Sequence, residues 1–158
     1  MVAYGSSAEE RLAIWSDDIG ANPVEATVVD VETVTRSAAA ASASDGAAES
    51  QPSNVRYKPV SDPTALIELG TTLDACLQSA TPARHTALCF HTLTDVLQYS
   101  ERREVSKFLN VLTGNVDRAG AVAHYHLDPA AHDDATVELF GRFCDAIVDV
   151  RDVDSSLY

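Results

Sequence analysis

Hydrophobic and polar positions along the chain fall into two alternating patterns, which predict strands and helices in turn. Short apolar runs of strand length stand at positions 1–4, 26–31, 87–90 and 119–126, and amphipathic helical stripes fill intervals between them. Continuous apolar runs beside helices are typical of parallel strands covered on both faces, because a half-exposed strand would alternate. The pattern therefore predicts one α/β domain over residues 1–158. Its three layers would be a mainly parallel central sheet with helices on both faces.

The stretch 86–128 organises this prediction, because it holds a strand, a long helical pattern and a second apolar run. In parallel sheets of this class, ligands bind at the carboxyl ends of the strands. Here those ends carry His91-Thr92 and the segment 124–128, whose sequence is HYHLD. This edge of the sheet is therefore where a ligand site would be expected, while the activity stays open.

The first third of the chain predicts a strand, a helix and a second strand, followed by a loop. A helix is expected from Ser6 or Ser7 to Ile19, and a strand at 26–31, where the sequence ATVVDV is rich in β-branched residues. Residues 37–53 are mostly alanine and serine, with glycine and acidic residues among them and no periodicity, so they predict a mobile loop, with a short helical turn as the alternative.

The middle of the chain predicts an edge strand and two helical regions. Pro59 limits a short strand at 55–60 to an edge or an end of the sheet. Ser61-Asp62-Pro63 predicts the start of a helix that runs to about Gln78. Asp95 is the candidate cap of a short helix at 96–100, and the next helical pattern continues to Gly114.

The end of the chain predicts one more helix and a last strand. Asp133 and Asp134 precede a helical stripe at 137–143, and the run AIVDV at 146–150 has the composition of a strand. The acidic tail at 152–158 is expected to fray.

The charge of the chain is strongly acidic. Asp and Glu number 24 against 11 Lys and Arg, which gives a net charge of −13. Acidic excess with only two lysines indicates a protein of a halophilic cytoplasm, where salt screens the repulsion between carboxylates; an ordinary acidic protein is the alternative. Direct nucleic-acid binding is not expected, because the chain has no basic stripe.

The cysteines and the hydropathy profile indicate a reduced, cytoplasmic setting. Cys76, Cys89 and Cys144 are widely spaced among apolar residues and form no CxxC pair, so we expect reduced core thiols. The N-terminus shows no targeting signal, and no apolar run approaches the ~20 residues needed to span a bilayer. We therefore expect no membrane association.

Three stretches of the chain stand out together with the order of the elements: CFHTLTDVLQY, FLNVLTGNVDRAGAVAHYHLDPAAHDDATVELF and FCDAIVDV. At these stretches the chain resembles the RecA/KaiC-like ATPase superfamily and, within it, haloarchaeal KaiC-like proteins. The resemblance implies an incomplete RecA-like core, with strand 1–4 corresponding to the second core strand of the family.

The departures from this superfamily concern its catalytic parts. The phosphate-binding motif GxxxxGK[ST] is absent from the printed sequence. Gly5, Ser6 and Ser7 occupy the region of the catalytic glutamate, and His91 aligns with the acidic residue that helps to hold magnesium. Each of these missing parts contributes orders of magnitude to the rate of phosphoryl transfer in the superfamily. These departures from the resemblance therefore predict no ATP hydrolysis, no catalytic residue and no nucleotide-binding residue.

A histidine cluster is the one candidate metal site. His124 and His126 share one side of a strand by its period of two, and Asp128 and His132 follow within six residues. Imidazole and carboxylate donors suit zinc or another borderline divalent metal. The alternative is that these residues hydrogen-bond the neighbouring loop and cap the following helix. His91 is a further ligand, or a satisfied polar residue, if its strand lies next to this one.

Residues 101–107 form the one concentrated charged patch. Its arginines would contact a partner or a phosphate, or else the patch is a solvated face with mixed ion pairs.

The sequence as a whole predicts a non-catalytic regulatory or interaction module that binds no cofactor. Its expected partner is a second copy of itself or a related ATPase, reached through the surface left bare by the missing first strand. The alternatives are a metal-binding protein or metal-dependent enzyme at the histidine cluster, and a complete ATPase whose start lies upstream of Met1.

Overall fold

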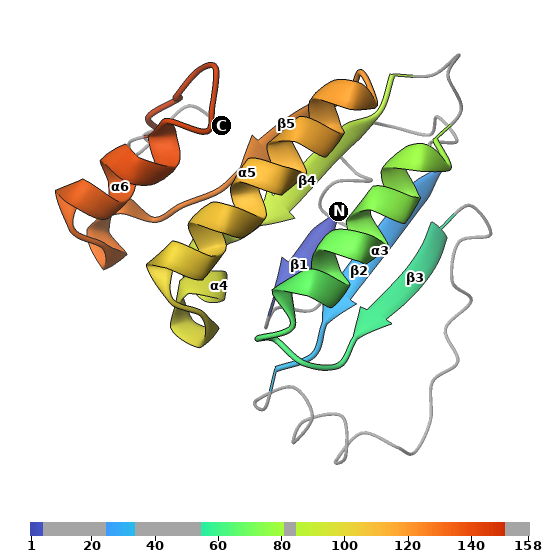
Figure 1. Ribbon diagram of the computed structural model, residues 1–158, viewed down its shortest axis with the longest axis horizontal. Coiled ribbons are helices and arrows are strands. Elements are labelled where there is room, and N and C mark those ends of the chain that lie inside the picture. The colour runs from blue at the N-terminus through green and yellow to red at the C-terminus, as the bar shows by residue number, and fades with distance from the viewer. Residues whose placement is uncertain (5–24, 34–54, 81–84, 151–158) are drawn as a thin grey trace, which may run out of the picture.

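The computed structural model describes residues 1–4, 25–33, 55–80 and 85–150, and its centre is a parallel β-sheet (Figure 1). The five strands stand in the order β3-β2-β1-β4-β5, and every neighbouring pair is parallel. Their bounds are β1 Val2–Tyr4, β2 Ala26–Val31, β3 Val55–Val60, β4 Ala87–His91 and β5 Val122–Tyr125. The predicted α/β fold with a mainly parallel sheet is confirmed.

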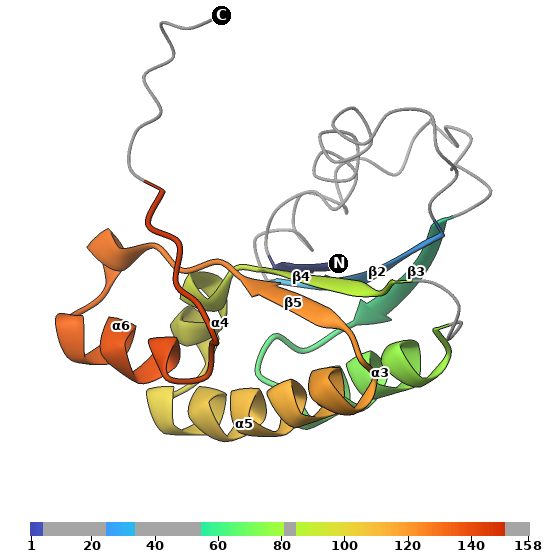
Figure 2. The same ribbon diagram turned by 90° about the horizontal axis from the view of Figure 1, so that it is seen from above.

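Two long helices, α3 and α5, cover one face of this sheet. In Figures 1 and 2, α3 and α5 lie side by side across it, while α6 lies beyond the β5 edge. Their bounds are α3 Leu66–Gln78, α4 Leu93–Tyr99, α5 Arg102–Arg118 and α6 Asp134–Gly141. The helix predicted to run to Ile19 falls outside the described residues, as do the predicted loop at 37–53 and the tail at 152–158. None of the described helices is both long and apolar enough to cross a membrane.

The main core lies between the sheet and helices α3 and α5. Alternate residues of the inner strands point into it, among them Val2 and Tyr4 of β1 and Leu88 and Phe90 of β4. The intervening residues point to the opposite face, where Ala3 and Val28 are buried. This alternation places Cys89 and His91 on the opposite face as well.

β1 is the central strand. It pairs with β2 on one side and with β4 on the other, and its three residues are buried. Neither edge of β1 is open, because a described strand pairs with each. The outer strands of the described sheet are β3 and β5.

The sequence predicted the edge position of one outer strand, β3, but not that of the other, β5. Pro59 lies in β3, and β3 is an edge strand as predicted. β5 was expected to be a buried run, but it is an edge strand whose residues alternate between exposed and half-buried. The run 119–126 is shorter as a strand because Ala119 and Gly120 end helix α5.

Three helix boundaries differ from the prediction. Helix α3 begins at Leu66 instead of beside Ser61, because Asp62 Oδ1 accepts hydrogen bonds from the Thr64 N–H at 2.8 Å and the Thr64 hydroxyl at 2.7 Å, which closes a turn before the helix. Helix α4 is capped by Thr92, whose Oγ1 accepts from Asp95 N at 3.1 Å, so Asp95 lies within the first turn. Helix α5 passes through Gly114 and continues to Arg118.

The segment 146–150 forms no strand within the described structure, although its sequence predicts one. The chain leaves α6 through a turn in which Phe143 N donates to Phe140 O and Cys144 N donates to Gly141 O. Residues 146–150 pair with no described strand. Ile147, Val148 and Val150 are therefore exposed.

Candidate functional site

The strand order creates a switch point between β1 and β4. From β1 the chain adds β2 and β3 on one side, and it then returns to add β4 and β5 on the other. In open parallel sheets the crevice outside the carboxyl ends of two such strands is the usual ligand site. His91, the last residue of β4, is the register partner of Ala3 in β1 and so stands at this point.

Two histidines meet at this edge, and we call His91 and His126 the imidazole pair. Their ring centroids lie 4.8 Å apart and the ring planes differ by 20°, so the rings are stacked. The backbone fixes His126 here, since its N–H donates to Phe90 O at 3.2 Å and its carbonyl accepts from Leu93 N at 2.8 Å. His126 Nε2 also lies 3.7 Å from Cys89 Sγ. The carboxyl ends of β4 and β5 thus bring two imidazoles and a thiol together.

Asp128 and His132 are directed to a different group, the hydroxyl of Thr94. Thr94 Oγ1 accepts a hydrogen bond from Asp128 N at 2.9 Å and lies 3.2 Å from His132 Nε2. The carboxylate of Asp128 accepts from Ala130 N at 2.9 Å and caps the short 3-10 helix η1, Pro129–Ala131. These contacts match the alternative interpretation of the cluster, in which its members bind the neighbouring loop and cap the next turn.

The four predicted ligands are therefore not gathered at one point. His124 is exposed on β5, opposite Cys89 in the strand register, while His126 stacks on His91. Asp128 and His132 are both held at Thr94. In the part of the chain that the structure describes, no group of three or more His, Cys, Asp or Glu side chains could hold a metal ion.

Cys89 and Thr94 contact the predicted site residues, but the sequence did not single out either of them as part of the site. Cys89 is half-buried on the face opposite the main core. The sequence held one indication for Cys89. Because alternate residues of a strand point to the same face, Cys89 shares a face with His91 and lies opposite Leu88 and Phe90. Thr94 gives no comparable signal, since a threonine after a strand is common at helix starts.

One family model matches residues 1–150, and its description is a family of unknown function, DUF7504. The chain belongs to the DUF7504 family. No curated protein and no solved structure matches it. The matched range of this DUF7504 chain contains all five strands of the described sheet, the imidazole pair and the segment 146–150.

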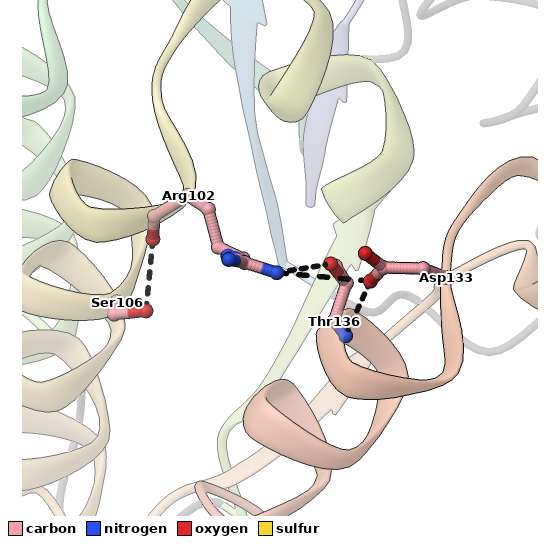
Figure 3. A network of polar contacts seen from close by, with 4 residues as sticks. All are labelled: Arg102, Ser106, Asp133 and Thr136. Atoms are coloured by element: carbon pink, nitrogen blue, oxygen red, sulfur yellow. Dashed lines mark hydrogen bonds and ion pairs between the residues drawn. The ribbon is translucent and has the colours of Figure 1, made fainter.

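Arg102 of this DUF7504 protein joins the starts of two helices (Figure 3). Its Nη1 donates to Thr136 Oγ1 at 3.0 Å and lies 3.7 Å from Asp133 Oδ1. Asp133 Oδ1 accepts from Thr136 N at 2.8 Å and caps α6. Nearby, Lys107 Nζ donates to Glu104 Oε1 at 2.8 Å. The charged patch 101–107 thus contains intramolecular ion pairs on a solvated face, and Arg102 fixes α6 against α5.

Replacing Asp133 by alanine is expected to lower the free energy of unfolding at neutral pH, because helix α6 loses its cap. Asp133→Asn is the matched control, since asparagine also caps helices and should retain most of the stability. The hydrogen bonds from Thr136 hold the pKa of the Asp133 carboxyl below its usual range. A lowered pKa in the folded state stabilises the protein above the unfolded pKa of about 4, and this contribution is lost as the pH falls through the folded value.

Urea unfolding of the three proteins at neutral and acidic pH measures this effect. The difference between wild type and Asp133→Ala should shrink as the pH falls below about 4. A difference that stays constant across this range would show that the carboxylate charge plays no part in the cap.

Proposed function

We propose that this protein is a non-catalytic regulatory or interaction module, derived from a RecA/KaiC-like ATPase and working in the cytoplasm of a halophilic archaeon. The observation that carries the proposal is the β5 edge. Within the described residues β5 pairs only with β4, and it contains neither a charged residue nor a proline. An edge of this kind offers unpaired N–H and C=O groups as a template for another strand.

The carboxyl edge of the sheet supports the non-catalytic part of the proposal. At the end of β4, where the resemblance implies a magnesium-binding acid, the chain places His91 against the ring of His126. Magnesium prefers oxygen ligands, so an imidazole at this position is a poor substitute for a carboxylate. The printed sequence also lacks the phosphate-binding motif.

The polar side chains near this edge have structural partners. Thr92 caps α4, Asp128 caps the short helix η1, and Thr94 holds Asp128 and His132. Hydrogen bonds of this type fix the loop between β5 and α6. They support a stable scaffold for an interaction surface more than a set of groups poised for proton transfer.

The acidic charge of the chain limits the class of partner. With a net charge of −13, the protein would be repelled by a nucleic-acid backbone. The proposed partner is a protein, either a second copy or an intact ATPase relative, which pairs with the sheet edge. Salt at halophilic concentration would screen the repulsion between two acidic proteins.

Isothermal titration calorimetry with ATP and Mg²⁺, in high salt, tests the non-catalytic part of this proposal. We expect no saturable heat of binding and no release of phosphate over hours of incubation. The control is the same titration with the magnesium chelated. Saturable binding that requires magnesium, or turnover of ATP by the isolated chain, would overturn the proposal.

A further inference from the structure

The two edges of the described sheet are protected to different degrees. The outer strand β3 carries Arg56, Lys58 and Pro59, and Arg56 forms an ion pair with Glu25. Lysine, arginine and proline on an edge strand hinder the addition of another strand. The outer strand β5 has the sequence VAHY, with none of these residues, and Val122 is 60% exposed. Strand addition is therefore opposed at β3 and unopposed at β5.

The same chain contains a segment that has the composition of a strand but belongs to none of the described strands. Three of the five residues at 146–150 are β-branched and apolar, and Ile147, Val148 and Val150 are 72%, 81% and 78% exposed. Six large hydrophobic residues are exposed in the described part of the chain, and four of them belong to β5 or to this segment. Exposed apolar surface concentrated in this way marks an interaction site.

The segment and the β5 edge lie on the same side of the molecule. In Figures 1 and 2 the chain that follows α6 lies beyond β5, at the end of the sheet away from β3. A Cβ on Gly141 would come within 2.8 Å of Ile147 Cδ1, so Ile147 packs closely on the last turn of α6. This packing and the turn at Phe143 and Cys144 direct the segment away from its own sheet.

We propose that two copies of this chain form a dimer in which the segment 146–150 of each copy adds as a further strand to β5 of the other. This inference rests on the proposed interaction function and names its partner and its surface. One chain carries both halves of the contact, an unprotected edge and a segment of similar length that lies outside the described sheet, so a twofold arrangement satisfies both edges and both segments at once. The exchanged strand would cover Val122 and the valines of the segment, which remain exposed in the single copy.

Electrostatics makes this association dependent on salt. Two copies that each carry a net charge of −13 repel each other over a distance set by the ionic strength. The Debye length falls from about 10 Å at 0.1 M salt to about 3 Å at 1 M. β5 itself carries no charged side chain, so screening removes the general repulsion while hydrogen bonding at the edge remains. The fraction of dimer should therefore rise with salt.

Sedimentation velocity of the full chain, at about 0.1 M and about 1 M salt, tests the inference together with three variants. Val148→Asp places a carboxylate in the exchanged strand, and Val122→Lys places a charge on the β5 edge. Ile67→Asp is the matched control, because Ile67 is 88% exposed on α3, away from both elements. Circular dichroism confirms that each variant is folded.

We expect a dimer at high salt for the wild type and for Ile67→Asp. Each of the other variants should weaken dimerisation about tenfold per strand contact, and so about a hundredfold for the two contacts of a dimer. A mixture of Val148→Asp with Val122→Lys should dimerise more tightly than either variant alone, because one of the two contacts is then intact. This partial rescue would not follow from a general loss of surface hydrophobicity.

A monomeric wild type at high salt would overturn the dimer, as would a Val148→Asp variant that dimerises normally or an Ile67→Asp variant that does not. The calorimetric titration with ATP decides the non-catalytic function independently. If the protein is a monomer that binds no ATP, the strand exchange is wrong and the non-catalytic function stands. If it is a dimer that hydrolyses ATP, the non-catalytic function is wrong and the strand exchange stands.

Discussion

Replacing Phe90 by alanine is expected to lower the free energy of unfolding by about 3–5 kcal/mol. The Phe90 side chain is fully buried in β4, next to the central strand. Its ring lies 6.2 Å from Tyr4, 5.9 Å from Phe108 and 6.2 Å from Tyr125, measured between centroids. These three rings belong to β1, α5 and β5, so the substitution leaves a cavity at the point where the sheet meets its covering helix.

Chemical denaturation of the wild type and the variant in the same high-salt buffer measures this loss. Phe143→Ala is the matched control, because Phe143 is only half-buried after α6, at the margin of the core, and its ring lies 6.5 Å from that of Phe140 in a tilted arrangement. Its loss should be clearly smaller than that of Phe90. An equal loss for both variants would show that the aromatic cluster around Phe90 is not the centre of the core.

The inner architecture could be predicted from the sequence because its signals are local. Strand β2 has the predicted bounds of 26–31, where β-branched residues continue for the length of a strand. Strand β3 has the predicted bounds of 55–60, and Pro59 correctly marked it as an edge strand. The buried stripe of α3, which includes Leu69, Leu73 and Leu77, follows the helical period.

Helix starts were predicted less well because several side-chain oxygens compete near each one. Asp62 precedes α3 and is of a residue type that often caps helices, but its carboxylate closes a turn with Thr64. Thr92 and Asp95 could each cap α4, and Thr92 does so. The choice depends on where the preceding element ends in space, which a local pattern does not contain.

The position of strand edges depends on pairing between distant segments, and this limited the prediction at the end of the chain. β5 and the run at 146–150 have similar strand propensity, yet only β5 finds a partner among the described strands. Propensity reflects how well a side chain fits a pleated surface, and it does not say which surface is present. The proposed exchange between two copies would supply the missing surface.

The positions of the clustered histidines also depend partly on spacing along the chain and partly on contacts between distant segments. The period of two placed His124 and His126 together, but β5 ends at Tyr125, and the ring of His126 stacks on His91 of the neighbouring strand. The expected proximity of His91 is confirmed. Asp128 could not be placed from spacing, because Pro129 starts a new turn that Asp128 caps.

Replacing Gly120 by valine is expected to lower the free energy of unfolding by about 1–3 kcal/mol, the second largest effect among these substitutions. Gly120 has a φ of 61°, in the left-handed region that disfavours side chains with a branched Cβ. Its N–H donates to Asp117 O at 2.9 Å, and Ala121 N donates to Val116 O at 3.0 Å. These two bonds form the Schellman motif that ends α5 and turns the chain into β5.

Gly114 provides the matched control because it lies in the same helix. A Cβ at Gly114 would meet only the flexible end of Arg118, at 3.6 Å. Gly114→Ala should therefore raise the free energy of unfolding by up to about 1 kcal/mol, since alanine favours helix over glycine. Urea denaturation of both variants separates the two roles. Opposite signs would establish that Gly120, and not the Gly114 indicated by the sequence pattern, ends the helix, whereas a Gly120→Val variant as stable as the wild type would contradict this assignment.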